Sequence, residues 1–421
     1  MAARLGAKGQ ADDLIGLLDI GNGKTVCLIV AMPRSGGRSD RARVLGVGVQ
    51  PTHGLKAGVV VALDEAEQAV RAAVAQAERA AGVRVEEVFL SVACGRSRSH
   101  TFTANTEVEG AVVGSADIER LTAAARAHVE RDGRTLLHMN CISYRLDSAT
   151  GIDEPLGLAG RTLAADLHAV TCDEAPLHNL LQAIERAYLS PVGIVPASYA
   201  SGLAATTEEE RQRGVVAIDI GAGTTTLAAF ARGHLLSTDV VPVGANHATL
   251  DLAHALSAPA HEAERIKKEY GTLARVVPDD RELVSYVLAG EDDSVRGEIA
   301  KGEVRGIVRG RMLRLFGHIA ARIERSGIAE FVMQRMVLTG GGSQLAGLGE
   351  FAADFFVRPA RIARIEPFDG MPAGFDSPAF STSIGLVHAA LDPNAGTREN
   401  RGRLEAGGYL RRVGQWLREG L

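Results

Sequence analysis

The chain has 421 residues, with 46 lysines and arginines against 51 aspartates and glutamates, and 46% of its residues are hydrophobic. That length corresponds to about two to four domains, and the hydrophobic share excludes wholesale disorder. A formal net charge of -5 argues against nucleic acid as the main partner, because neutralising phosphates needs a concentrated basic surface.

The cysteines and the N-terminus narrow the class of protein further. Cys27, Cys94, Cys141 and Cys172 are widely spaced, which predicts reduced, packed thiols in a cytoplasmic protein rather than a disulfide framework or a zinc site. Residues 1–13 are polar and rich in alanine and glycine, so we expect no secretory signal. No stretch approaches 18 consecutive apolar residues, the length expected of a membrane-spanning helix.

The first part of the chain is predicted to combine short strands with one helix. Four apolar runs predict strands, at residues 14–18, 25–32, 44–49 and 58–61. The helix expected over 64–81 has small apolar residues at the 3.6-residue period. We expect Asp64 to cap its start, with Glu67 at the capping-box position, and Gly82 to end it. Strands followed by a helix indicate an α/β layer architecture.

Residues 83–161 differ in pattern from the preceding segment and predict an inserted small α+β domain. They contain an apolar run at 85–92, a helical pattern at 117–129 and a second strand-like run at 134–145.

A second α/β block comes after the insertion. It opens at Val215 and returns at residues 336–339, and between them residues 259–270 and 296–325 predict charged helices. Residues 392–408 have the composition of a flexible linker.

One motif occurs twice. The heptapeptide DIGNGKT at 19–25 recurs as DIGAGTT at 219–225, with five of seven positions identical and an apolar run on each side of both copies. Each copy predicts a glycine-rich hairpin between two strands, whose backbone N–H groups can approach an anion. An aspartate ahead of each hairpin would repel a bare phosphate, so it implies a cation such as Mg²⁺ between carboxylate and phosphate. Two copies across a cleft would clamp a nucleotide polyphosphate, whereas a single copy could equally be an ordinary hairpin turn.

A third glycine cluster comes after the apolar pair at 336–337. Gly340, Gly341 and Gly342 precede Ser343 and a predicted helix, and three glycines let a flat ligand such as an adenosine lie against bare backbone. A plain strand-to-helix turn is the alternative interpretation.

Together these loops resemble the ATPase fold shared by actin, Hsp70 and sugar kinases. Within that superfamily the chain resembles the FtsA family of bacterial cell division proteins over nearly its whole length. Further matching segments are 47–48, 54–60, 137–138, 155–158 with Gly160, 199–204, and 263–268 with Gly271.

The resemblance implies a site for ATP and Mg²⁺, with Asp19 and Asp219 near the metal and in contact with it through water. It assigns the remaining contacts by position: Gly21, Asn22, Gly23, Lys24, Thr25, Gly221, Ala222, Gly223, Thr224 and Thr225 to the phosphates, Glu264 and Lys267 to the ribose or adenine, and Gly340, Gly341, Gly342 and Ser343 to the adenosine. Lys268 is expected to form only an i,i+4 surface ion pair with Glu264.

The fold that the resemblance implies is α/β, a two-lobed actin-like ATPase with an inserted small α+β subdomain and a C-terminal amphipathic helix. The expected parts are 1–82, first lobe with its phosphate hairpin; 83–161, inserted subdomain for self-association; 162–205, rest of the first lobe; 206–258, second lobe with its phosphate hairpin; 259–325, helical subdomain on the adenine side; 326–391, rest of the second lobe; 392–408, linker; and 409–421, membrane-targeting helix.

Hydrolysis is expected to be slow or negligible. Orienting the attacking water needs a polar group, and in actin-like ATPases it precedes the first connecting helix. Residues 191–197 (PVGIVPA) hold no carboxylate, amide or imidazole.

The helix expected over 296–325 is a candidate partner surface. Arg305, Arg309, Arg311 and Arg314 fall at three- and four-residue offsets, so they could share one face, either solvated or bound to a partner. The resemblance implies that this subdomain binds the acidic tail of the tubulin-like protein FtsZ, with Arg309 and Arg311 as leading candidates. No histidine pairs with a second ligand at metal spacing, and His138, His168 and His247 are expected to be structural.

The last residues predict an interfacial helix. Its apolar positions recur at helical spacing: Leu410, Val413, Trp416, Leu417 and Leu421. From Arg398 onward there are six arginines against three glutamates, which suits an anionic membrane surface. Docking of this helix on the protein body is the alternative, which the linker at 392–408 makes less favourable.

The resemblance therefore implies a protein that polymerises, tethers the FtsZ ring to the inner face of the cytoplasmic membrane at mid-cell and recruits later division proteins. An Hsp70-type chaperone would need a substrate-binding domain after the second lobe, and a sugar or acetate kinase would need a catalytic base that the sequence does not identify. A pilus-type actin-like adaptor would not explain the amphipathic tail.

Overall fold

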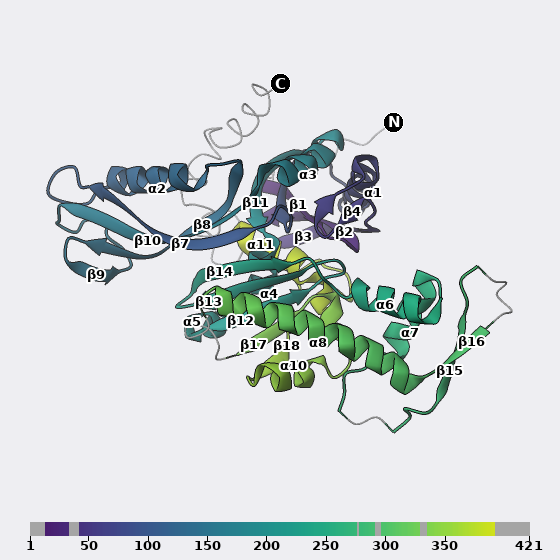
Figure 1. The fold of residues 1–421 in the computed structure, drawn as a ribbon. Helices are drawn as coiled ribbons and strands as arrows, with labels where there is room; N and C mark the ends of the chain where they lie inside the picture. The colour runs from purple at the N-terminus through teal and green to yellow at the C-terminus, as the bar shows by residue number, and fades with distance from the viewer. Residues whose placement is uncertain (1–12, 33–41, 276–277, 291–295, 329–334, 392–421) are drawn as a thin grey trace, which may run out of the picture.

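Two similar five-stranded sheets organise the molecule (Figure 1). The computed structural model describes residues 13–32, 42–275, 278–290, 296–328 and 335–391. In the first lobe the strands lie in the order β11 (Ser190–Pro196), β6 (Glu87–Val92), β1 (Asp13–Ile20), β2 (Lys24–Met32) and β3 (Arg43–Pro51). The β1–β2 and β2–β3 pairs are antiparallel, and the β1–β6 and β6–β11 pairs are parallel.

The sheet of the second lobe repeats this plan. Its strands lie in the order β18 (Ala360–Ile362), β17 (Met336–Thr339), β12 (Val215–Ile220), β13 (Thr225–Ala231) and β14 (His234–Val241). The senses match strand for strand, with β12–β13 and β13–β14 antiparallel and β12–β17 and β17–β18 parallel. The heptapeptide therefore repeats because the architecture around it is repeated. The α/β prediction for both blocks is confirmed.

Two helices lie between the sheets and hold the lobes together. α4 (Ala197–Ala205) continues from β11, and α11 (Ser381–Leu391) is the last described element. Their backbones pack closely, since a Cβ added to Gly385 would lie 1.7 Å from the carbonyl oxygen of Ala200. Only glycine permits that approach. The buried core of the first lobe continues through α4 and α11 to Phe230 and Val337 of the second.

On the outer face of the first sheet, α1 (Leu63–Ala81) packs beside α3 (Glu174–Arg186). Gly82 ends α1 with a φ of 71°, as predicted, but the expected capping by Asp64 is wrong. The N-cap is Ala62, which provides no side-chain hydrogen bond. Glu67 instead forms ion pairs with Arg71 at 2.8 Å and Arg186 at 3.0 Å, which join the two helices.

The inserted layer has its own sheet and core. Its strands lie in the order β7 (Arg98–Glu107), β10 (Thr162–Asp173), β8 (Arg134–Leu146) and β9 (Ala149–Ile152), and α2 (Ser115–Val129) packs on them. The layer begins and ends later than the expected 83–161. The strand expected at 85–92 is β6, which pairs with β1 and β11 inside the first-lobe sheet.

The remaining elements lie mostly around the second lobe. They are α5 (Glu208–Arg213), α6 (Asn246–Leu256), α7 (Ala260–Tyr270), α8 (Lys301–Arg325), α10 (Leu348–Phe356), the short helices η1 (Gly341–Gln344) and η2 (Pro378–Phe380), the hairpin β15 (Leu283–Val287) and β16 (Arg296–Ala300), and in the first lobe β4 (Leu55–Lys56) and β5 (Val59–Val60). The helix expected at 259–270 is confirmed as α7. The one expected at 296–325 begins only at Lys301, because residues 296–300 pair with β15.

The four cysteines are free in the structure, three of them buried and Cys141 partly so. Within the described part of the chain, no helix combines the length and apolar character that crossing a bilayer requires. The predicted linker at 392–408 and helix at 409–421 lie outside the described residues.

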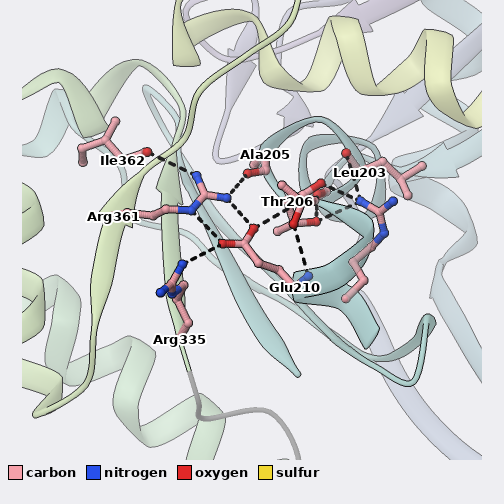
Figure 2. Close-up of polar contacts among 10 residues, drawn as sticks. Leu203, Ala205, Thr206, Glu210, Arg335, Arg361 and Ile362 are labelled. Atoms are coloured by element: carbon pink, nitrogen blue, oxygen red, sulfur yellow. Dashed lines mark hydrogen bonds and ion pairs between the residues drawn. The ribbon is translucent and has the colours of Figure 1, made fainter. Parts of the chain in front are cut away.

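A partly buried carboxylate fastens the start of the second lobe to its sheet edge (Figure 2). Glu210 on α5 completes a capping box with Thr207 and receives a hydrogen bond from Arg361 Nε at 2.8 Å. Arg335 approaches the same carboxylate at 3.4 Å, and Arg361 also donates to the carbonyl oxygen of Ala205 at 3.0 Å. Burial alone would raise the pKa of Glu210, but the hydrogen bonds from Arg361 and Thr207 outweigh it and lower the pKa to about 2.

We predict that Glu210→Gln destabilises the protein by about 2 kcal/mol at neutral pH. The full shift from 4.5 to about 2 corresponds to roughly 3 kcal/mol at 1.36 kcal/mol per pKa unit, and solvent at the arginines reduces it. Because the folded-state pKa is depressed, this stabilisation is present above pH 4.5 and disappears as the pH falls towards 2. Urea unfolding of both proteins at several pH values measures the difference.

Glu209→Gln is the matched control, because Glu209 is exposed and pairs with Arg213 on the same helix. We expect a change within about 0.5 kcal/mol for it. A stability difference for Glu210→Gln that stays constant between pH 7 and pH 3 would contradict the assigned role of the ionised carboxylate.

Candidate functional site

The two repeated hairpins face each other across one cavity. Each is closed by the same bond, from Gly21 N to Lys24 O at 3.0 Å and from Gly221 N to Thr224 O at 2.9 Å. The tips touch, since a Cβ added to Gly23 would lie 2.9 Å from the Cβ of Ala222. The cavity between the lobes has a volume of about 310 Å³.

Most of the predicted site residues line this cavity. They are Asp19, Gly21, Asn22, Gly23, Lys24, Asp219, Gly221, Ala222, Thr224, Gly340 and Gly341. The structure thus brings together residues from the start, middle and end of the chain, as the repeated motif predicted. Asn22 also accepts a hydrogen bond from Gly58 N at 2.8 Å, which ties the first hairpin to the loop around β4 and β5.

Two predicted threonines face elsewhere. The hydroxyl of Thr25 lies 2.7 Å from that of Thr52, and the hydroxyl of Thr225 donates to the carbonyl oxygen of Val243 at 2.7 Å. Side chains on a strand alternate between faces, so the neighbour Thr226 lines the cavity instead of Thr225. Gly223, Gly342 and Ser343 are also absent from the described lining, and Ser343 donates to Gly340 O at 2.8 Å.

Two carboxylates, one from each lobe, face the cavity. Asp19 is the next-to-last residue of β1 and accepts hydrogen bonds from Ser91 at 2.8 Å and Ser383 at 3.1 Å. Asp219 is the next-to-last residue of β12 and accepts one from Thr382 at 3.1 Å. Burial raises the pKa of both groups, and for Asp219 the nearby charge of Asp19 adds to the effect, so that its pKa is about 6.

The third glycine loop, at 340–342, is built around the second carboxylate. Gly340 has a φ of 82°, and an added Cβ would lie 2.2 Å from Asp219 Oδ1. Its N–H donates to the carbonyl oxygen of Pro378 at 3.1 Å. Any larger residue here would displace the carboxylate, so glycine is required at this position.

Lys24 carries the only positive charge among the described residues that line the cavity. Its ammonium lies 3.6 Å from the centre of the Phe380 ring, a cation–π contact. Burial lowers its pKa, against the opposing attraction of Asp19 and Asp219. The cavity therefore pairs two carboxylates with a single lysine, an imbalance that a divalent cation would correct.

These residues fit the ligand chemistry of Mg²⁺. Magnesium is commonly held by one or two carboxylates, with water and phosphate oxygens completing its six ligands. Asp19 and Asp219 supply two such carboxylates, and the described residues contain no set of three or more His, Cys, Asp or Glu side chains arranged to hold a metal.

Glu264 and Lys267 lie on α7, behind the second hairpin rather than in the cavity lining. Their charged groups are 2.6 Å apart, and Lys267 also donates to Thr249 at 2.8 Å and to Ala245 O at 3.4 Å. Ala245 N in turn donates to Gly221 O at 2.8 Å, so the cluster supports the hairpin. Lys268 forms the expected surface pair with Glu264, at 3.4 Å and largely exposed.

Sequence reasoning missed the segment 377–383, which contacts all three glycine loops. Phe380 meets Lys24, Pro378 meets Gly340, and Thr382 and Ser383 meet the two aspartates. Its hydroxyl-rich sequence, SPAFSTS, immediately precedes an apolar helix and was the available signal. Among residues 191–197, all of them described, Ala197 is the one that lines the cavity.

The arginines of α8 do not share one face. Arg309 stacks over the Phe351 ring of α10 at 4.6 Å, whereas Arg311 donates to Asp251 of α6 at 2.7 Å. Arg314 reaches the same aspartate at 3.0 Å, and Arg305 pairs with Asp279 and Asp280. The expectation of a single arginine face is therefore wrong. Beside Arg314, α6 and α8 border a groove of about 380 Å³ lined by Asp251, His254, Ala255, Gly306, Ile307, Gly310 and Arg314.

The three histidines expected to be structural make contacts of that kind. His168 is buried between the Ser99 hydroxyl at 2.6 Å and Asn140 Oδ1 at 3.3 Å, and burial lowers its pKa to about 3. His138 lies 4.6 Å from the Tyr199 ring, and His247 accepts a hydrogen bond from Gly244 N at 3.1 Å.

Two family models and a full-length relative match this chain, and all three carry the same family name. Residues 216–385 match the family model "Cell division protein FtsA", and residues 95–171 match "SHS2 domain inserted in FTSA". The cell division protein FtsA of Agrobacterium fabrum (strain C58 / ATCC 33970) is 38% identical over 423 residues, covering 96% of this chain and 94% of that protein.

Solved structures match in fold. A chain of the PilM-PilN type IV pilus biogenesis complex aligns with a TM-score of 0.63 and 17% identity, covering 91% of this chain and 100% of that one. MreB 5 of Spiroplasma citri bound to AMPPNP aligns with a TM-score of 0.52 and 14% identity, covering 94% and 98%. At these identities the likeness establishes the two-lobed actin-like fold alone.

Proposed function

The chain belongs to the FtsA family of cell division proteins, and on that premise we propose that it binds ATP with Mg²⁺ between its lobes and links the division ring to the membrane. The observation that carries the nucleotide proposal is the pairing of two glycine hairpins and two carboxylates around one cavity. MreB 5, which shares the fold, has been solved with AMPPNP bound.

The chain's own groups suit a triphosphate. The backbone N–H groups of both hairpins and the Lys24 ammonium would neutralise phosphate oxygens, and Gly340 and Gly341 would lie under the adenosine. Bound Mg²⁺ would supply positive charge between the phosphates and the two carboxylates. The cluster of Glu264, Lys267 and Thr249 would act on the ribose or adenine side by supporting the second hairpin.

Hydrolysis is proposed to be slow. A water beside the terminal phosphate needs a group that accepts its proton or orients it. The segment ahead of α4 offers only the methyl group of Ala197 to the cavity, so the protein would act as a nucleotide-dependent scaffold rather than a fast ATPase.

We predict that the protein binds ATP when Mg²⁺ is present and that Gly340→Ala abolishes binding at the same concentration. The added methyl group would overlap Asp219 Oδ1, 2.2 Å away, and displace the carboxylate. Isothermal titration calorimetry measures binding, and phosphate release should stay far below the enzyme median of roughly 10 per second.

Gly317→Ala on α8 is the control, because no atom lies within 4 Å of its added Cβ. An unmodified protein that fails to bind ATP would refute the nucleotide proposal. Phosphate release near the enzyme median would leave binding intact and refute slow hydrolysis.

The partner proposal concerns α8 and the helices beside it. The acidic C-terminal tail of FtsZ would bind this helical subdomain at α8, which has seven lysines and arginines against two glutamates. The groove between α6 and α8 is lined by Arg314, Ile307 and two glycines, among others. Arg311 donates a hydrogen bond to Asp251, which lines this groove, whereas Arg309 contacts Phe351 of α10.

We predict that Arg309→Glu with Arg311→Glu weakens binding of an FtsZ tail peptide about tenfold or more, a loss of about 1.4 kcal/mol. Fluorescence anisotropy with a labelled peptide measures the affinity. Arg325→Glu, at the exposed end of the same helix, is the charge-matched control. Undiminished affinity in the double variant would remove both arginines from the interface.

The membrane proposal rests on the sequence of the tail, including Leu410, Val413, Trp416, Leu417 and Leu421. One tail would bind weakly and reversibly, because ordering about a dozen residues at roughly 1–2 kcal/mol each offsets most of the apolar gain. Copies that associate, with the inserted subdomain as one contact surface, would bind firmly through many tails. The protein would then lie on the cytoplasmic face of the cell membrane at the division site, where later division proteins join it.

We predict that a protein ending at Glu405 no longer co-sediments with vesicles that contain anionic lipid. The full chain should pellet, and its bound fraction should rise more steeply than its concentration, as association of copies requires. Unchanged ATP binding by the shortened protein is the control for folding. Equal pelleting of both proteins would mean that the tail is not the anchor.

A further inference from the structure

We propose that Thr382 and Ser383, in the first turn of α11, are positioning residues that set the two carboxylates for a shared cation. The inference rests on the proposed function and assigns to these hydroxyls a role that the glycine loops cannot perform. Thr382 Oγ1 donates to Asp219 Oδ2 and Ser383 Oγ donates to Asp19 Oδ2, each at 3.1 Å.

The geometry ties two separate sheets to one short piece of backbone. Asp19 lies one residue before the end of the central strand of the first sheet, and Asp219 has the same place in its counterpart in the second. The residues that hold them are consecutive, and consecutive Cα atoms are about 3.8 Å apart. The distance between the carboxylates is therefore set by two consecutive residues of one helix rather than by the relative position of the lobes.

The first turn of α11 is itself firmly held. Ser381 donates to Pro378 O at 2.8 Å and its hydroxyl meets that of Thr339, which pairs with Asp219 in the β12–β17 register. Ser383 is 1% exposed. One turn further on, Gly385 packs against the backbone of α4, so the two donors cannot shift without moving the helix pair between the lobes.

Each donor leaves capacity on the carboxylate for a cation. An ionised carboxylate has about four acceptor positions. Asp19 uses one for Ser91 at 2.8 Å and one for Ser383, and Asp219 uses one for Thr382 and one for Ser201. Both aspartates line the cavity, where magnesium-bound water would donate to the remaining positions. Magnesium tolerates little deviation from octahedral geometry, so the orientation of these oxygens decides how well it binds.

Groups that orient metal ligands contribute measurably to metal affinity. Removing such a partner commonly costs 10- to 100-fold in affinity for the metal. Thr382→Val keeps the size and branching of the side chain but removes the hydroxyl. Thr382→Ser keeps the hydroxyl and removes a methyl group, so the two variants separate orientation from packing.

The experiment titrates Mg²⁺ into full-length protein with a fluorescent ATP analogue and repeats the binding measurement in excess EDTA. For Thr382→Val, and for Ser383→Ala as the second variant, we expect half-maximal binding at about 10- to 100-fold higher Mg²⁺, with affinity in EDTA changed less than twofold. Thr382→Ser should match the unmodified protein. Thr122→Val, which removes a hydroxyl bonded within α2, is the matched control.

An unchanged Mg²⁺ requirement in both Thr382→Val and Ser383→Ala overturns the inference. Equal changes in Thr382→Val and Thr382→Ser, or equal loss of affinity with and without Mg²⁺, would assign the residues to packing and overturn it as well. Failure of the unmodified protein to bind the analogue refutes the proposed function, and is distinguished from these outcomes because it appears before any substitution is made.

Discussion

Two like charges, one from each lobe, face the same cavity, and most of the site depends on that constraint. Burial makes the ionised forms of Asp19 and Asp219 costly and raises the pKa of both groups, and for Asp219 the nearby charge of Asp19 adds to the rise. The ionised carboxylates are stabilised by hydrogen bonds from the hydroxyls of Ser91, Thr382 and Ser383 and by the nearby ammonium of Lys24. These contacts moderate the repulsion without cancelling it. A divalent cation between the two carboxylates would stabilise their ionised forms.

The duplicated architecture explains why the two charges meet. Each sheet places its central strand next to an antiparallel hairpin and a parallel neighbour, so equivalent residues end equivalent strands. Asp19 pairs in register with Ser91, and Asp219 with Thr339. The halves differ just beyond the parallel neighbour, where the second lobe has Gly340 and the first continues to Val92. Gly340 therefore brings bare backbone against Asp219 in the cavity lining, whereas the first lobe has Val92 at the matching position.

The sequence was sufficient for features that depend on local pattern and repetition. The twin heptapeptides predicted hairpins that share a cavity, the spacing of small residues predicted α1, and a charged helical pattern predicted α7. It was insufficient where tertiary contacts decide. Asp64 had the right chemistry for a cap, but both Asp64 and Glu67 form ion pairs with Arg186 of α3. Residues 296–300 were predicted to be helical, but they form a strand because they pair with β15. Strand alternation turned Thr25 and Thr225 away from the cavity. The hydroxyls of Thr382 and Ser383 contact the two aspartates because α11 begins beside both, a tertiary contact that the hydroxyl-rich sequence SPAFSTS does not by itself specify.

The inserted layer adds a second link between the lobes. Its chain is rooted in the first lobe, between β6 and β11, yet it bonds to β14, the edge strand of the second sheet. Asn140 donates to Leu235 O at 3.2 Å, and Thr238 N donates to the Ser99 hydroxyl at 2.9 Å, with His168 in contact with both Asn140 and Ser99. An exposed edge strand invites pairing with other chains, and these side-chain bonds occupy it. Because the lobes are joined both here and through α4 and α11, a movement that opened the cavity would have to shift the inserted layer as well.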